Sequence, residues 1–438
     1  MSLSRRATLS GTLALTGCSI FDDLFESNKP PIPGKREAIL SSTRGLQVDA
    51  SDHGPVTLPP PVRNVDWLQA GGNPTHSMGN LAVGGYAKIW SREIGEGGGY
   101  RRKITASPIV AGSRVFTMDS NGTVSAFDVQ TGSPQWRTET QNENDRSTNI
   151  GGGIAAADGV IYAATGRGEA LALDAVKGAI KWRAWLDAPA RSAPTTVEGK
   201  LFMPTLDERM VALSAADGKR VWSYQATASA TIVLGEPAPA YSDGLLVGGF
   251  GSGDLVGLRA DSGTLAWSDS LASARGRASI SDLSAIRAVP VIVGNVVYAI
   301  GVGGLLVAID LRSGRRLWER EVAGQYMPWA AGDWLFVLTA EQQVAAIGRA
   351  DGRVRWITDL PRFDNPDKQR DPIFWAGPLV ADKHLFVAGS TRKLLVINPA
   401  DGAILSQQDL PAAASLSPIA AQGKVFVLTD DATLSALG

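Results

Sequence analysis

A motif of one glycine, three variable residues and one tryptophan recurs along this chain of 438 residues and limits what it can fold into. Its six copies are Gly132/Trp136, Gly178/Trp182, Gly218/Trp222, Gly263/Trp267, Gly314/Trp318 and Gly352/Trp356. A seventh copy keeps Gly402 but has Ser406 in place of the ring, and Trp90 supplies a ring without its glycine. Successive copies lie 38 to 51 residues apart. A period in this range with strand-like content indicates propeller blades or another repeat array.

Each repeat reads as four short strands. Within residues 107–137, two apolar stretches are followed by the Asn121-Gly122 turn, an alternating stretch and a last strand around Trp136. Asn-Gly between alternating residues is a strong hairpin signal, and short strands separated by Gly, Asn and Asp form antiparallel sheets. Residues 290–320 match this unit element for element. The sequence therefore predicts one four-stranded antiparallel blade for each repeat.

The glycine and the tryptophan of the motif are expected to be structural. A tight turn before the last strand favours glycine because glycine adopts positive φ without strain. A tryptophan buries about 150–250 Å² and brings one N–H group that needs an acceptor. We therefore expect these residues to pack each blade against the next: Trp90, Trp136, Trp182, Trp222, Trp267, Trp318, Trp356, Gly132, Gly178, Gly218, Gly263, Gly314, Gly352 and Gly402. Acids four residues before the turn glycine, such as Asp128, Asp174 and Asp310, are expected to cap the turn.

The two ends of the repeat region complement each other. After Ser406 the chain contains three more strand-like stretches and then ends, whereas residues 86–94 around Trp90 form an isolated strand-like stretch. If that N-terminal strand completes the last blade, the ring closes without an open end. The predicted fold class is therefore all-β, an eight-bladed β-propeller over residues 82–438 whose last blade is closed by the N-terminal strand.

Composition excludes some classes of protein. The formal net charge is −1 with 42 basic and 43 acidic residues. A nucleic-acid binder would show a basic stripe, so no nucleic-acid partner is expected. No apolar run reaches the 18 residues that a spanning helix needs.

The single cysteine, Cys18, lies in a context typical of exported chains. Arg5-Arg6 precedes a short, weakly apolar segment, and Leu15-Thr16-Gly17-Cys18 resembles the lipobox of bacterial lipoproteins, in which the cysteine is acylated. We expect a signal peptide over residues 1–17, a lipidated tether over 18–65 and a cap segment over 66–81. The twin arginines leave the export route open, and the alternative for Cys18 is an ordinary buried cysteine.

No motif of catalytic chemistry stands out. His53, His76 and His384 are scattered and show no metal-ligand spacing. The glycine cluster 248–253 does not fit a nucleotide-binding fingerprint and reads as a hairpin turn. No catalytic residue, metal site or cofactor is predicted.

The unit Ala-x-Asp-x-x-x-Gly-x-x-x-Trp resembles the repeat of the quinoprotein alcohol dehydrogenase-like propellers. It occurs at residues 126–136, 172–182 and 308–318. Enzymes of that superfamily bind pyrroloquinoline quinone and calcium and carry a vicinal disulfide, which a chain with one cysteine cannot form. The alternative of a periplasmic oxidoreductase of this type is therefore disfavoured.

With its lipobox, the chain resembles the non-enzymatic BamB family of the outer-membrane β-barrel assembly machinery. The stretches 67–76, 289–293 and 308–314 carry this resemblance. It implies a lipid-anchored scaffold on the periplasmic side of the outer membrane. The implied partners are the periplasmic domains of BamA, the other lipoproteins of the complex and unfolded outer-membrane proteins. A propeller that binds substrate strands by β-augmentation, as a chaperone, is a further alternative.

Long connections between blades are expected on one face of the ring, and such insertions commonly mark a binding face. Two of them are apolar for exposed segments, and in BamB proteins the matching loops contact BamA. Leu234 stands where that family has an arginine, and Ala285 and Arg287 where it has acids, so a more apolar contact or altered charges on the partner are expected. The candidate contact residues are Thr231, Ile232, Val233, Leu234, Glu236, Ile280, Asp282, Leu283, Ile286 and Arg287. The charged connection 359–375 is expected to be a surface loop or secondary contact.

Overall fold

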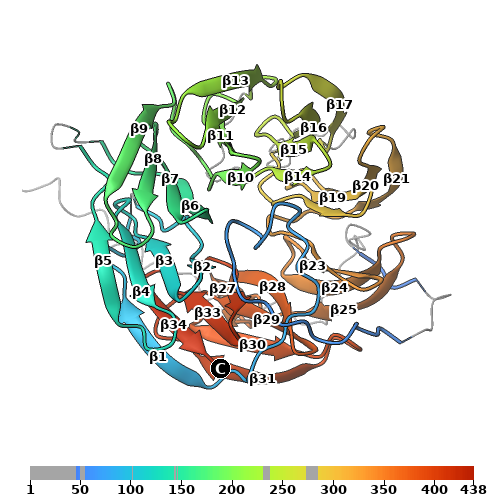
Figure 1. Ribbon diagram of the computed structural model, residues 1–438. Coiled ribbons are helices and arrows are strands. Elements are labelled where there is room, and N and C mark those ends of the chain that lie inside the picture. Colours follow the sequence, from blue (N-terminus) through green and yellow to red (C-terminus); the bar gives the residue numbers. More distant parts are fainter. Residues whose placement is uncertain are drawn as a thin grey trace, which may run out of the picture. The chain divides into compact units, whose positions relative to one another are not determined.

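Eight sheets of four antiparallel strands follow one another around a ring (Figure 1). The computed structural model describes residues 46–49, 55–100, 102–142, 145, 147–229, 237–272 and 285–438. Every regular element in this part of the chain is a β-strand. The predicted all-β propeller is confirmed.

Blades 1 to 4 use consecutive strands, with the first strand of each blade innermost. Their bounds are, for blade 1, β2 (Ile109–Ala111), β3 (Arg114–Met118), β4 (Val124–Asp128) and β5 (Pro134–Thr138); for blade 2, β6 (Gly152–Ala157), β7 (Val160–Thr165), β8 (Glu169–Asp174) and β9 (Ile180–Trp185); for blade 3, β10 (Thr195–Val197), β11 (Lys200–Thr205), β12 (Arg209–Ser214) and β13 (Arg220–Gln225); and for blade 4, β14 (Ala240–Ser242), β15 (Leu245–Gly249), β16 (Asp254–Arg259) and β17 (Leu265–Ser270).

Blades 5 to 7 repeat this order, and blade 8 joins the two ends of the repeat region. Their bounds are, for blade 5, β18 (Val291–Val293), β19 (Val296–Ile300), β20 (Leu305–Asp310) and β21 (Arg316–Glu321); for blade 6, β22 (Trp329–Ala331), β23 (Trp334–Leu338), β24 (Gln343–Gly348) and β25 (Val354–Asp359); for blade 7, β28 (Trp375–Ala381), β29 (His384–Gly389), β30 (Lys393–Ile397) and β31 (Ile404–Asp409); and for blade 8, β32 (Ile419–Ala421), β33 (Lys424–Leu428), β34 (Thr433–Leu437) and β1 (Lys88–Glu93). A small hairpin of β26 (Phe363–Asn365) and β27 (Arg370–Pro372) lies between blades 6 and 7.

Blade 8 closes as the sequence predicts, because β1 pairs antiparallel with β34. The pairing places Trp90 opposite Ala436 and Glu93 opposite Thr433. Gly438 N donates to Ala87 O at 2.9 Å and completes the junction between the two ends of the repeat region. The ring therefore closes by hydrogen bonds and packing rather than by a covalent turn.

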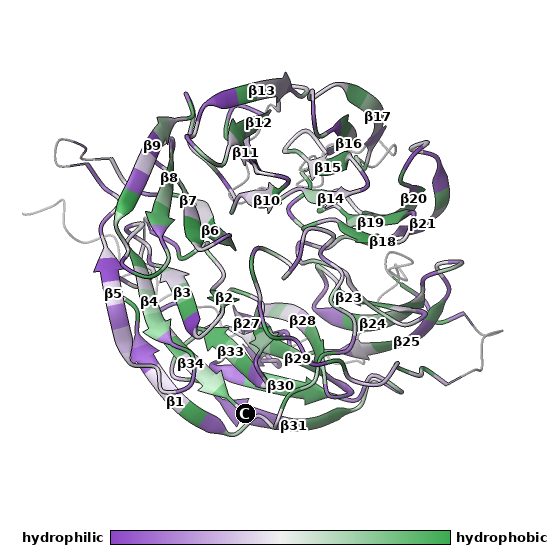
Figure 2. Ribbon diagram, viewed as in Figure 1, coloured by the Kyte–Doolittle hydropathy of each residue, from purple (hydrophilic) through white to green (hydrophobic). Residues whose placement is uncertain are grey.

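The core lies in the middle strands of the blades. The strands β3, β7, β19, β23 and β33 are almost wholly buried, whereas outer strands such as β5 and β21 alternate between exposed and partly buried residues. Figure 2 shows the same contrast as hydrophobic colour on β30 and β33 and hydrophilic colour on β5 and β21. Since a blade buries its apolar faces only against its neighbours, closure of the ring matters for stability.

The glycine–tryptophan motif joins adjacent blades. The Trp136 ring of blade 1 lies against Gly178 of blade 2, where an added Cβ would be 2.5 Å from Trp136 Cε3. Trp136 Nε1 donates to Ala175 O of that blade at 3.1 Å. Trp90, Trp182, Trp222, Trp267, Trp318 and Trp356 repeat both contacts with the next blade.

Turn-capping by the recurring aspartates is also observed. Asp128 Oδ1 accepts hydrogen bonds from Thr131 N at 2.8 Å and Gln130 N at 3.0 Å. The backbone N–H of Thr131 is the main reason that the pKa of Asp128 lies below its usual range. Asp174 and Asp310 bond the same turn positions.

Alternation of strand direction gives the ring two faces. We call the side with the turns at Gly112 and Gly132, and their equivalents, the turn face. The opposite side, which we call the connection face, carries the turns between second and third strands and the chain segments that join one blade to the next.

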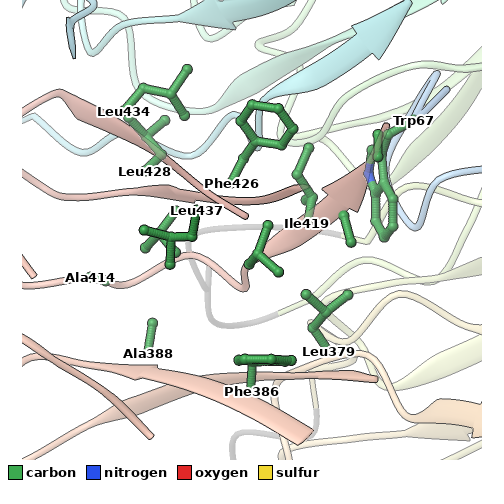
Figure 3. Close-up of a cluster of buried hydrophobic side chains, with 14 of the residues drawn as sticks. Trp67, Leu379, Phe386, Ala388, Ala414, Ile419, Phe426, Leu428, Leu434 and Leu437 are labelled. Atoms are coloured by element: carbon green, nitrogen blue, oxygen red, sulfur yellow. The ribbon is translucent and has the colours of Figure 1, made fainter. Parts of the chain in front are cut away.

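The N-terminal segment runs around the inside of the ring (Figure 1). Residues 62–86, which we call the inner belt, bond the inner edge of every blade in turn, from blade 8 through blades 1 to 7 and back to blade 8. The bonding belt residues are Asn64 (blade 8), Trp67 (1), Leu68 (2), Gln69 (3), Pro74 (4), Thr75 (5), Gly79 (6), Leu81 (7) and Gly84 (8). Figure 3 shows Trp67 in the same cluster as Leu379 of blade 7 and Ile419 of blade 8.

The described residues before the belt also lie against blades. Asp49 N donates to Val354 O at 2.9 Å, and Asp49 Oδ2 accepts Val354 N at 2.7 Å and pairs with Arg320 at 3.4 Å. Val56 is buried, and Pro59 lies over Gly332 of blade 6. This part of the segment expected as a tether is therefore held on blades 5 and 6.

Candidate docking site

The candidate contact segments leave the connection face on either side of blade 4. One joins β13 to β14 and the other joins β17 to β18. Residues 230–236 and 273–284 of these connections lie outside the described residues, and with them Thr231, Ile232, Val233, Leu234, Glu236, Ile280, Asp282 and Leu283. The structure therefore defines the bases of both loops and leaves the contact itself a prediction.

The bases of the two loops meet on one glycine. A Cβ on Gly249 would lie 2.5 Å from Ile286 Cγ2 and 3.2 Å from Pro237 Cγ, so only glycine leaves room for both side chains. Ile286 N donates to Phe250 O at 3.0 Å, and Val302 N donates to Ala285 O at 3.0 Å. The glycine cluster that reads as a hairpin turn thus forms the end of β15 and the turn to β16, and it holds the bases of the two loops, at Pro237 and Ile286, side by side.

Of the two described candidates, Ile286 is buried and Arg287 is partly buried. Ile286 is 0% exposed, so it anchors the base of its loop and is not accessible to a partner. Arg287 Nη1 donates to Gln325 Oε1 at 2.7 Å, and burial lowers the pKa of Arg287. Burial also raises the pKa of the neighbouring Tyr326 to about 12.

A buried carboxylate links blades 3 and 4 near the bases of the two loops. Glu208, in the β11–β12 turn of blade 3, accepts a hydrogen bond from Gly251 N at 2.9 Å. Burial is the main cause that raises the pKa of Glu208. The bond ties the turns of blades 3 and 4 together on the connection face. Sequence reasoning did not find Glu208, because its turn carries no repeated motif.

The charged connection between blades 6 and 7 forms the β26–β27 hairpin on the connection face. Its residues are mostly exposed, and Phe374 beside it is 54% exposed. Its base is fixed, since Ile373 N donates to Arg362 O at 2.8 Å and Trp375 Nε1 donates to Pro361 O at 2.8 Å. The prediction of a surface loop is correct for this segment, and a second contact there remains a prediction.

The other singled-out residues have ordinary surroundings or lie outside the described residues. His76 is buried in the inner belt and His384 lies in β29, whereas His53 and Cys18 fall outside the described ranges. Among the residues with described positions, no three His, Cys, Asp or Glu side chains are grouped to hold a metal ion. That same part of the chain contains no helix able to cross a membrane.

The fold and its motif define a propeller of the quinoprotein type. Its superposition on a quinohemoprotein alcohol dehydrogenase from Comamonas testosteroni gives a TM-score of 0.63 at 13% identity, over 84% of this chain and 76% of that enzyme. Such identity shows a shared fold alone.

A family model described as "Outer membrane protein assembly factor BamB" matches residues 87–149, 120–358 and 363–438. The chain belongs to the BamB family. The Yersinia pestis protein of that name is 27% identical over 356 residues, which cover 80% of this chain and 88% of that protein. The crystal structure of BamB from Moraxella catarrhalis superposes with a TM-score of 0.69 at 19% identity, over 80% of this chain and 99% of that one. These relatives are named as assembly factors and not as enzymes, in agreement with the expectation of a non-catalytic protein.

Proposed function

We propose that this chain is a non-catalytic, lipid-anchored scaffold of the outer-membrane β-barrel assembly complex. It docks on the periplasmic domains of a BamA-type barrel protein, beside other lipoproteins of the complex, and aids delivery or insertion of outer-membrane proteins. The observation that carries the proposal is the match to the BamB family along nearly the whole ring. Acylation at Cys18 holds the protein on the periplasmic side of the outer membrane.

The docking surface lies on the connection face at blade 4. Its two loops share the base at Gly249, and the bonds of Phe250 and Glu208 fix that base. A loop whose base is already ordered loses less conformational entropy on binding. The apolar side chains Val233 and Leu283 supply the contact, because burying apolar side chains is the main source of binding energy in a protein interface.

An oxidoreductase is the second class of function that this ring can host. A quinone with calcium needs acids that converge on the metal ion, and no such group occurs among the described residues. The inner belt also fills the centre of the ring with residues such as Trp67, which stacks on Trp329 at 6.2 Å. The described residues therefore do not fit such a cofactor. A chaperone that adds substrate strands to the outer strands is a further candidate, because each blade ends in an open edge.

Co-purification tests the proposal. A C-terminally tagged chain is extracted from native membranes in mild detergent, and mass spectrometry identifies the bound proteins and the Cys18 peptide. We expect a stoichiometric BamA-type protein and an acylated Cys18. Val233→Asp and Leu283→Asp should each lower recovery of that partner about tenfold or more, since a charge at an interface hot spot costs roughly 2 kcal/mol or more.

Val221→Asp is the matched control, because Val221 is 46% exposed at the start of the outer strand of blade 3, next to the turn face. It should leave recovery unchanged. The docking surface is wrong if both loop variants recover the partner like the unaltered chain. Recovery of the chain alone, or with quinone and calcium, would contradict the proposed function itself.

A further inference from the structure

The junction between blades 7 and 8 differs from the other seven. Ser406 stands at the tryptophan position of blade 7 and is exposed. Blade 8 also has no covalent turn between its third and fourth strands, because β34 is the last described strand of the chain and β1 is the first. Both halves of the glycine–tryptophan contact are therefore missing at this junction.

An aromatic ring from the other side fills the position. In most blades the tryptophan packs on an aromatic residue of its own second strand, as Trp356 does on Phe336 at 6.1 Å. Phe386 holds the equivalent position in blade 7. Besides His384 of its own strand, the ring that packs on it is Tyr86, just before β1, at 5.7 Å. The contact is thus made from blade 8 to blade 7, in the reverse direction.

The inner belt is fastened most firmly around this junction. Towards blade 7, Leu81 O accepts Asp382 N at 2.7 Å, and Asn80 Oδ1 accepts Lys383 N at 3.1 Å. Towards blade 8, Asn64 O accepts Gln422 N at 2.7 Å, and Gly84 N donates to Gly423 O at 2.8 Å. Blades 2, 3 and 4 are each bonded through a single belt residue.

The two ends of the belt overlap at the same place. Val62 N donates to Asn80 O at 2.8 Å, and Ala82 N donates to Val62 O at 2.8 Å. Asn80 is 2% exposed, and its Nδ2 also donates to Pro59 O at 2.8 Å. The belt therefore forms a closed circuit whose overlapping ends lie at the one junction without the tryptophan contact.

We propose that the inner belt is a closure device: its overlapping ends and Tyr86 hold blades 7 and 8 together, and the ring opens first at this junction when they are released. The belt substitutes there for the contact that joins the other blades. The opening is a sub-global event, which separates blade 7 from blade 8 while blades 2 to 5 stay packed.

Hydrogen exchange followed by mass spectrometry of the full chain tests the proposal. Asn80→Ala should speed amide exchange in β31, β32 and β1 about tenfold, the change expected when an opening becomes easier by about 1.4 kcal/mol. Exchange in blades 2 to 5 should not change. Gln69→Ala is the matched control, since Gln69 is also a belt residue at 2% exposure but accepts its bond from Thr196 N of blade 3.

A second pair of variants covers the case in which Asn80→Ala does not fold. Tyr86→Ala should speed exchange in the same three strands, and Tyr86→Phe should restore it, because the ring and not the hydroxyl packs on Phe386. Equal acceleration in all blades, no acceleration at the junction, or the same result for Gln69→Ala and Asn80→Ala would each overturn the proposal.

Discussion

At the residue scale, the glycine of the repeated motif meets two demands at once. Gly178 has a φ of +72°, which side chains disfavour, and the ring of Trp136 occupies the space where a Cβ would stand. The residue opposite each tryptophan is small for the same reason. Trp136 pairs with Ala126, Trp267 with Gly257 and Trp318 with Ala308. The repeat pattern in the sequence therefore results from one packing contact, that of a tryptophan on the glycine of the next blade.

Two substitutions can separate the cost of positive φ from the cost of a clash with the tryptophan ring. Gly178→Ala should destabilise the protein by about 2–3 kcal/mol, because it adds a clash with Trp136 to the strain of positive φ. Gly159→Ala is the matched control, since its φ is +74° but nothing lies within 4 Å of its Cβ position. It should cost only about 1 kcal/mol. Denaturant unfolding measures both, and equal losses would show that the ring contact contributes nothing.

His76 makes stability depend on pH. Its Nδ1–H donates to Pro290 O at 2.7 Å, and its Nε2 is buried without a described partner. Burial lowers the pKa of His76 from 6.5 to about 4. A lowered pKa in the folded state means that the unfolded chain binds the proton more tightly. Stability from this group is thus fully present above pH 6.5 and is lost as pH falls towards 4.

The free energy of unfolding should fall by up to about 3 kcal/mol between pH 7 and pH 4, because folding lowers the pKa of His76 from 6.5 to about 4. Unfolding by denaturant at several pH values should show this slope in the unaltered chain. His76→Gln should have a shallower slope over the same window, because the glutamine does not titrate. Parallel slopes for the two proteins would contradict the assignment.

At the element scale, the blades could be predicted from sequence and the inner belt could not. Alternating strands with Gly and Asn turns carry local signals, so β3, β4 and the Asn121-Gly122 turn between them follow from neighbouring residues. The belt has no period, because the residues that bond successive blades are unevenly spaced along it. Tyr86 lies 300 residues from Phe386, and no local pattern marks that pair.

Part of the candidate docking site could likewise be predicted from the sequence, and part could not. The spacing of the repeats predicted which connections are long. Strand alternation predicted that they all emerge on one side of the ring. It did not predict that Gly249 joins the two loop bases or that Ile286 is buried. Both outcomes depend on contacts between connections on opposite sides of blade 4, which periodicity does not encode.

At the scale of the whole molecule, the residues before the belt and the bases of the candidate loops lie on opposite faces of the ring. The residues before the belt cross blades 5 and 6 at Asp49 and Pro59, and Pro59 meets the turn at Gly332 on the turn face. The candidate loops at blade 4 and the β26–β27 hairpin leave from the connection face. A partner can therefore reach the bases of the loops without displacing Asp49 or Pro59 from blades 5 and 6.

This arrangement predicts that docking is sensitive to obstruction of one face only. A short biotinylated acceptor peptide inserted between Gly303 and Gly304 lies on the connection face of blade 5, where Val302 bonds the base of a candidate loop. Streptavidin bound there should abolish co-purification of the barrel partner by blocking access.

The same insertion between Gly294 and Asn295 of that blade lies on the turn face, with open space around Gly294. It should leave co-purification intact with or without streptavidin. Loss of the partner from the turn-face insertion, or its retention in both, would show that the connection face is not the docking surface.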